Sequence, residues 1–262
     1  MRKACCNNRQ QGRGERTCCA APRLAAAVAA VVLLSAIGGC VTRQPAPPAR
    51  SAARAASLQP TSRLGQAFEV VAARSNLVVL AYRAGPLAAM GHDHVIACHC
   101  LTGVVYVPSD PLRASFAVRI AVTQLSVDDP RLRAAEHSAD FPPDVPQSAR
   151  RGTRKHMLGG AFLDAAKHAD IRLRSQGLRP SPDGKPGDVL ARIAVQVLGG
   201  WHSTTVPIHY VMQRGRIVAT GSFPLKQTDI GLTPYGVFGG ALRVKDEMKI
   251  RIRLVARRRA GR

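Results

Sequence analysis

The residues of this chain that are best suited to chemistry lie in one short run, in which the motif GHDH is followed by the motif CHC. Imidazole, carboxylate and thiolate groups are the ligands that zinc and copper prefer, and the run holds six such side chains within nine residues. It therefore predicts a zinc or copper site at His92, Asp93 and His94, to which Cys98 and Cys100 could contribute.

The spacing of the run limits how it could bind a metal. If it were one straight strand, His92 and Cys98 would lie about 20 Å apart, because a strand rises about 3.3 Å per residue. That separation is too long for one coordination sphere. A metal site would need a bend near Gly91, or ligands from elsewhere in the chain, such as His137, His156 and His168.

Two other interpretations of the GHDH motif stay open. In the first, the motif is a tight turn in which Gly91 adopts an unusual backbone angle and Asp93 accepts hydrogen bonds from nearby amides. The two histidines are then polar partners of their neighbours. In the second, a histidine contacts the anionic head group of a ligand.

Cys98 and Cys100 have three possible states. An oxidising compartment favours a disulfide, yet two residues on one strand face have Cα atoms about 6.6 Å apart, near the upper limit for a bridge. A strained bridge, free thiols and metal ligation all remain open.

Catalytic motifs are missing from the sequence. It contains no phosphate-binding glycine loop with lysine, no GxSxG, no HExxH and no CxxC, which are the patterns of common enzyme sites. Serine, histidine and aspartate occur without the spacing that marks a nucleophile and its base. We therefore expect a protein that is not an enzyme and has no catalytic residue.

The elements that must position these residues are mostly strands. Apolar and polar residues alternate strictly over several segments, with the period of a strand that is buried on one face. Gly199-Gly200 and Arg214-Gly215 mark turns between neighbouring segments, and short connections imply antiparallel pairing. Eight strands are predicted, over residues 77–84, 101–107, 116–122, 171–174, 192–197, 206–213, 217–225 and 248–254.

Strands with one apolar face must stack in two sheets or close on themselves, and closure removes exposed edges. We expect an all-β, eight-stranded antiparallel barrel, a size that can enclose one small ligand or be filled by its own side chains. The residues expected to line the lumen and bind an apolar ligand are Phe116, Val118, Ile120, Ile193, Val195, Ile208, Tyr210, Phe223, Ile250 and Ile252.

The alternation stops over about 128–169, where short helices are predicted at 147–157 and 161–168. A long connection with helices of its own is more often functional than disordered. We expect this helical excursion to cover the barrel mouth.

The N-terminal region predicts export. A basic leader precedes the apolar run Leu24 to Gly39, which is shorter than the roughly 20 residues of a membrane-spanning helix and fits a signal peptide. The run ends in IGGC, which resembles the lipobox of bacterial lipoproteins. Cleavage after residue 39 would leave a lipid-bearing Cys40, with palmitate among the expected acyl chains, and an anchor in the outer membrane facing the periplasm.

The expected domain organisation follows from this signal-peptide interpretation and from composition. After the signal at 1–39, residues 40–67 are rich in proline, alanine and arginine and predict a flexible tether. The barrel domain should occupy 68–257, and 258–262 form a basic tail.

The charge of the chain is strongly positive. The leader holds six of the 38 basic and one of the 16 acidic residues, which leaves a formal charge of +17 after cleavage. This charge favours anionic neighbours. Nucleic acid is nevertheless excluded by export and by an aromatic content of 4%, which is too low for a base-stacking platform.

In its order of motifs, the chain resembles the YceI family of periplasmic, lipocalin-like barrels associated with polyisoprenoid binding. The resemblance covers about residues 75–256 and implies a lumen that holds an isoprenoid tail without covalent chemistry. The lipobox and GHDH are similar to a lipoprotein-type branch. The matching segments are SNLVV (75–79), GHDH (91–94), DP (110–111), LDAA (163–166) and KQTDIGLTP (226–234) leading to GGALRVKDEM (239–248).

Two functions are thus expected from different classes. The first is an envelope protein that binds an apolar isoprenoid-like lipid in a barrel lumen. The alternative is a periplasmic metal-binding or redox accessory protein that uses the GHDH and CHC residues, with zinc or copper as its cofactor.

Overall fold

Alternation of apolar and charged residues produces an antiparallel sheet that closes on itself. The computed structural model describes residues 59–182 and 184–259. Its strands are β1 Gln66–Val70, β2 Asn76–Ala84, β3 His94–Cys98, β4 Leu101–Val107, β5 Ser115–Ala121, β6 Ser126–Val127, β7 Asp170–Pro180, β8 Asp188–Val197, β9 Gly200–Gln213, β10 Arg216–Lys226, β11 Gly236–Val237 and β12 Leu242–Arg258.

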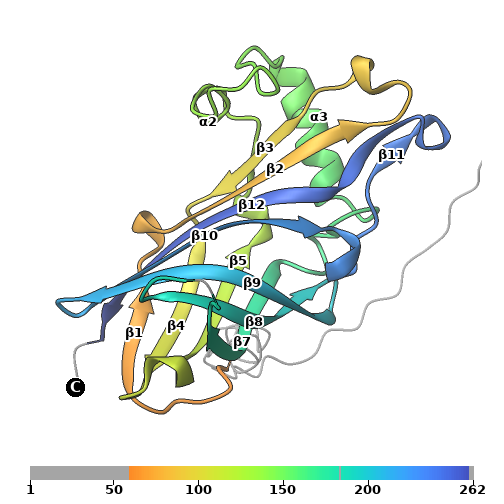
Figure 1. The fold of residues 1–262 in the computed structure, drawn as a ribbon. Coiled ribbons are helices and arrows are strands. Elements are labelled where there is room, and N and C mark those ends of the chain that lie inside the picture. Colours follow the sequence, from red (N-terminus) through yellow and green to blue (C-terminus); the bar gives the residue numbers. More distant parts are fainter. Residues whose placement is uncertain (1–58, 183, 260–262) are drawn as a thin grey trace, which may run out of the picture. The chain divides into compact units, whose positions relative to one another are not determined.

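Eight of these strands form a ring in the order β1-β4-β5-β7-β8-β9-β10-β12, and β12 pairs with β1 to close it (Figure 1). All the pairings are antiparallel. β2, β3 and β6 continue the sheet from β12 as extensions of β1, β4 and β5. The expected eight-stranded antiparallel barrel is confirmed.

Three short interruptions each divide one long stretch of extended chain into two consecutive strands. The 3-10 helix Ala72–Arg74 separates β1 from β2, residues 99–100 separate β3 from β4, and the 3-10 helix Val122–Gln124 separates β5 from β6. The sequence prediction missed β1, β3, β6 and β11, each of which is five residues long or shorter.

The strand β12 shows how the sequence pattern builds the wall. Met248 and Ile250 are buried on the inner face, whereas Lys249 and Arg253 are exposed on the outer face. The apolar side chains are thus shielded from water and the charged side chains stay solvated, as expected for a sheet with one buried and one solvent-exposed face.

Tight hairpins join the later strands. Leu198 and Gly199 have φ values of 51° and 81°, and Arg214 and Gly215 have 48° and 70°. Two consecutive positive φ values match the twist of antiparallel hairpins, and glycine adopts them without a Cβ clash. Both turns were expected, but Gly200 belongs to β9 instead of the first turn.

The connection over 128–169 departs from the sheet and has two parts. Leu132 and Phe141 cover the outer face of β2 and β3, where they pack with Val78, Leu80 and Val95. The short helix α2 (Pro130–Ala134) lies in this part, and α3 (Gln147–Leu158) follows it at the same end of the barrel (Figure 1).

The predicted helix over 147–157 is confirmed by α3, whereas the one over 161–168 is wrong. Those residues form turns, in which Asp164 has a φ of 40°. A left-handed residue at this position stops a right-handed helix from continuing. The sequence analysis also did not predict α2, although Asp129 followed by Pro130 is a typical helix start.

Several sequence predictions fall outside the described residues. The signal peptide, the lipidated Cys40, most of the tether and residues 260–262 of the basic tail lie there. β1 begins at Gln66, two residues inside the stretch expected to be tether. Within 59–182 and 184–259, no helix combines the length and the apolar character needed to cross a bilayer.

Candidate functional site

The barrel encloses a cavity of about 410 Å³, which we call the lumen. Ligand sites for small molecules typically measure about 300–1,000 Å³. All ten residues predicted to line the lumen do so: Phe116, Val118, Ile120, Ile193, Val195, Ile208, Tyr210, Phe223, Ile250 and Ile252.

The side chains of the barrel do not fill it. Phe116, Ile193, Ile208 and Phe223 point inward yet are only half-buried, because part of their surface faces the lumen. In a barrel packed solid these positions would be fully buried, as Val118 is. The lumen therefore has room for an apolar guest.

Sequence reasoning missed part of the lumen wall. Ile217, Leu225 and Leu254 follow the same alternation as their predicted neighbours, so the strand period could have found them. Met157 on α3 and Leu163 beyond it also line the lumen, but no strand pattern indicates them. Their position agrees with the expectation that the excursion covers one mouth.

Polar side chains line the lumen both near α3 and on β9. His94 on β3, His156 on α3 and Tyr235 all line the lumen. The rings of His156 and Tyr235 lie 5.4 Å apart between centroids. The α3 end therefore offers these three polar side chains, whereas the rest of the wall is mostly apolar but includes Thr204 and Tyr210 of β9.

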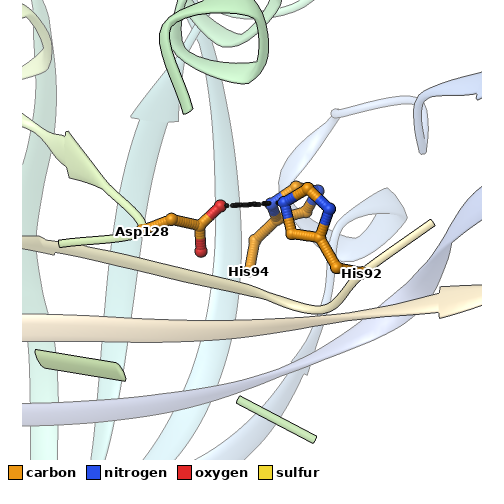
Figure 2. A group of neighbouring side chains, drawn as sticks. All are labelled: His92, His94 and Asp128. Carbon is orange, nitrogen blue, oxygen red and sulfur yellow. Dashed lines mark hydrogen bonds and ion pairs between the residues drawn. The ribbon is translucent and has the colours of Figure 1, made fainter. Parts of the chain in front are cut away.

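His94 belongs to a second feature, a group formed by His92, His94 and Asp128 (Figure 2). Asp128 Oδ2 lies 2.8 Å from His94 Nδ1 and 3.3 Å from His92 Nε2. Asp128 follows β6 directly, and its side chain is fully buried. We call these three residues the His92–His94–Asp128 group.

The other carboxylate oxygen of Asp128 is held by fixed donors. The backbone N–H of Val95 donates to Oδ1 at 2.9 Å, and Arg133 Nη1 donates to it at 2.7 Å. Arg133 is itself fully buried on α2, where its Nε donates to the carbonyl of Pro142 at 2.6 Å. The carboxylate of Asp128 thus has a fixed orientation.

Electrostatics in this group favour an ionised carboxylate. Burial by itself raises the pKa of Asp128, but the hydrogen bonds from His92 and His94 and the N–H of Val95 outweigh it and hold that pKa well below its ordinary value. Asp128 is therefore a buried negative charge that faces two imidazole rings.

Asp93 lies apart from this group, although the sequence pointed to it as a ligand beside His92 and His94. Its Oδ1 accepts a hydrogen bond of 2.6 Å from the backbone N–H of Arg83, which is the turn role that the sequence also allowed. Asp128 takes the position expected for Asp93.

The cysteine pair also lies outside the group. Cys98 and Cys100 form a disulfide between β3 and β4, with Cα atoms 5.3 Å apart. The chain is irregular at residues 99–100, so the two Cα atoms approach more closely than on an ideal strand. Of the three states left open by the sequence, the structure has the bridge, and a bridged sulfur is not a thiolate ligand.

Several solved structures are similar to this chain. The crystal structure of BcnA from Burkholderia cenocepacia superposes with a TM-score of 0.52 at 16% identity, over 71% of this chain and 98% of that one. A polyisoprenoid binding domain from Saccharophagus degradans, implicated in plant cell wall breakdown, gives a TM-score of 0.47 at 10% identity, over 74% and 99% of the two chains.

A YceI protein from Campylobacter jejuni gives a TM-score of 0.42 at 12% identity, over 61% of this chain and 82% of that one. A search of curated protein sequences found no match. The YceI-like domain matches residues 97–256, which run from the end of β3 to near the end of β12. With its closed eight-stranded barrel, the chain belongs to the YceI family.

Proposed function

We propose that this protein binds one apolar, isoprenoid-like lipid in the lumen of its barrel and carries or sequesters it without chemical change. The observation that supports this proposal best is the unfilled lumen of about 410 Å³ with its apolar wall. Burial of each methylene contributes about 0.8 kcal/mol, so a hydrocarbon tail can bind there without any polar anchor.

The distribution of polar groups suggests an orientation for the lipid. His94, His156 and Tyr235 lie on the wall at the α3 end. Ile217 and Leu254 line the lumen toward the opposite end, where Tyr210 lies in the same row as Leu254. A polar head group is best placed at the α3 end and a tail along Ile217 and Leu254, because an unpaired polar group in an apolar cavity is costly.

We also propose that the protein works at the cell envelope. The basic leader, the apolar run and the IGGC sequence support export followed by lipidation at Cys40, with the barrel facing the periplasm from the outer membrane. The mass of the mature protein tests this point. A diacylated Cys40 at the N-terminus is expected, and a Cys40→Ser variant should leave the membrane fraction.

Native mass spectrometry of the full chain purified from membranes tests the lipid proposal. A non-covalent adduct with the mass of a prenyl lipid is expected, and it should be replaced when the protein is incubated with a second prenyl alcohol. A chain that carries no adduct and takes up no prenyl alcohol would contradict the proposal.

A further inference from the structure

The His92–His94–Asp128 group goes beyond lipid binding, because three potential metal-ligand atoms converge in the barrel wall. One ring nitrogen of His92, one of His94 and one oxygen of Asp128 all lie within 4.8 Å of one another, and the two imidazole rings meet edge to face at 4.6 Å between centroids. Figure 2 shows both rings turned toward the carboxylate.

Two of the separations between these atoms suit bonds to a common metal ion. The distances from Asp128 Oδ2 are 2.8 Å to His94 Nδ1 and 3.3 Å to His92 Nε2. With metal bonds of about 2.0–2.1 Å, such separations correspond to angles at the metal of about 85–110°. Both angles fall in the range from octahedral to tetrahedral coordination.

The carboxylate is oriented as a metal ligand would be. Val95 N–H and Arg133 Nη1 both donate to Oδ1 of Asp128, which leaves Oδ2 for the two imidazoles. Hydrogen bonds to the second oxygen of a ligating carboxylate are a common way to fix its direction. Here a backbone amide and a fully buried guanidinium provide them.

The chemistry of the donors selects the class of ion. Two imidazoles and one carboxylate suit zinc and other divalent transition metals, whereas calcium and magnesium prefer oxygen ligands. Three protein ligands leave at least one coordination position for water or another ligand. His94 also lines the lumen, so this position would be near the lipid site.

Arg133 limits the expected affinity. Its guanidinium repels a cation and already donates a hydrogen bond to the carboxylate of Asp128. We therefore expect binding weaker than that of a structural zinc site.

We propose that His92 Nε2, His94 Nδ1 and Asp128 Oδ2 bind one divalent transition-metal ion of the zinc type in the barrel wall. The competing interpretation is a hub of hydrogen bonds in which both imidazoles donate to Asp128 and no metal binds. The two interpretations differ in one respect, namely whether the imidazole nitrogens act as lone-pair donors to a metal.

Glutamine variants separate the two interpretations. The double variant His92→Gln with His94→Gln keeps amide donors near Asp128 but removes both imidazole ligands. The matched control is His209→Ala, which removes an exposed histidine that pairs with Asp188 at 2.7 Å. Circular dichroism establishes that each full-length variant is folded, and the cysteines outside the described residues are common to all of them.

Equilibrium dialysis against micromolar zinc, followed by elemental analysis, gives the stoichiometry. Wild type and His209→Ala should bind one zinc ion more per chain than the double glutamine variant. With cobalt in place of zinc, visible absorption bands should appear only where both histidines are present. Equal zinc content in all three proteins, or no zinc on wild type at these concentrations, would overturn the proposal in favour of the hydrogen-bonded hub.

Discussion

A tryptophan placed in the lumen should weaken lipid binding. Ala219 on β10 lines the lumen, and its partners across the sheet are Tyr210 of β9 and Leu254 of β12, which line it too. In Ala219→Trp the indole would extend from this point into the space for the lipid. Ser222 lies on the exposed outer face of the same strand, so Ser222→Trp is the matched control.

The expected loss of affinity follows from the apolar surface of the lipid that would no longer be buried in the lumen. If the indole displaces one five-carbon isoprene unit, the lost burial is about 4 kcal/mol, at about 0.8 kcal/mol per carbon. The lumen is continuous along the barrel, so the lipid can shift away and recover part of this loss. We therefore expect Ala219→Trp to weaken binding at least about tenfold, or 1.4 kcal/mol, and to affect long prenyl chains more than short ones.

Fluorescence titration with prenyl alcohols of increasing length provides the assay. Wild type has one tryptophan, Trp201, which is 38% exposed and has the guanidinium of Arg174 over its ring at 3.8 Å. Emission from a lumen tryptophan at position 219 should be blue-shifted relative to emission from position 222. Unchanged affinity in Ala219→Trp across all chain lengths, or an equal loss in Ser222→Trp, would refute the lumen as the binding site.

Three further predictions concern the stability of the barrel. Arg133→Met should lower the free energy of unfolding by about 3–5 kcal/mol, because it leaves the buried Asp128 without its guanidinium partner; urea denaturation measures this, and a loss below 1 kcal/mol would contradict it. The lowered pKa of Asp128 stabilises the fold above its unfolded value of 3.8, and this contribution disappears as the pH falls further. The melting temperature of wild type should thus drop more steeply below about pH 4 than that of Asp128→Asn, and parallel curves would refute this. Replacing Cys98 and Cys100 with alanine should cost less than about 2 kcal/mol in unfolding free energy, because the bridge closes only a three-residue loop, and a larger loss in urea would show another role for it.

The barrel could be predicted because its evidence is repeated along the chain. Each long strand alternates between a wet and a dry face, as in Ile250 and Arg253 of β12, and the period of two is set by strand geometry alone. The same period placed all ten predicted residues on the lumen wall. A single residue slip in register would have moved an entire row to the outside.

The connection over 128–169 could not be predicted to the same degree, because tertiary contacts determine it. Leu132 and Phe141 pack against Val78 and Val95 on the outer face of β2 and β3. Their own sequence does not indicate these partners. Likewise, the residues around Asp164 have good helix propensity, yet the left-handed backbone at Asp164 ends any helix there. Local propensity is too weak to decide such cases.

Asp128 shows most clearly what sequence spacing leaves out. It lies 34 residues from His94, so a search for ligands near GHDH finds Asp93 instead. The pairing of β6 with β3 aligns Val127 with Ile96, and the ladder continues one step further because Asp128 N–H donates to the carbonyl of Val95 at 2.8 Å. Its carboxylate in turn accepts the N–H of Val95.

The side chain of Asp128 thus completes the sheet where the backbone turns away with a φ of 53°. That geometry gives the carboxylate two tasks in one place. It joins the barrel wall at Val95 to the covering segment at Arg133, and it faces the two histidines with its remaining oxygen. A metal bound there would connect the wall of the lumen to the segment that covers the outer face, and loss of that carboxylate should loosen both. Asp128 therefore stabilises the wall of the lumen, whether its partner is a metal ion or only the imidazole rings.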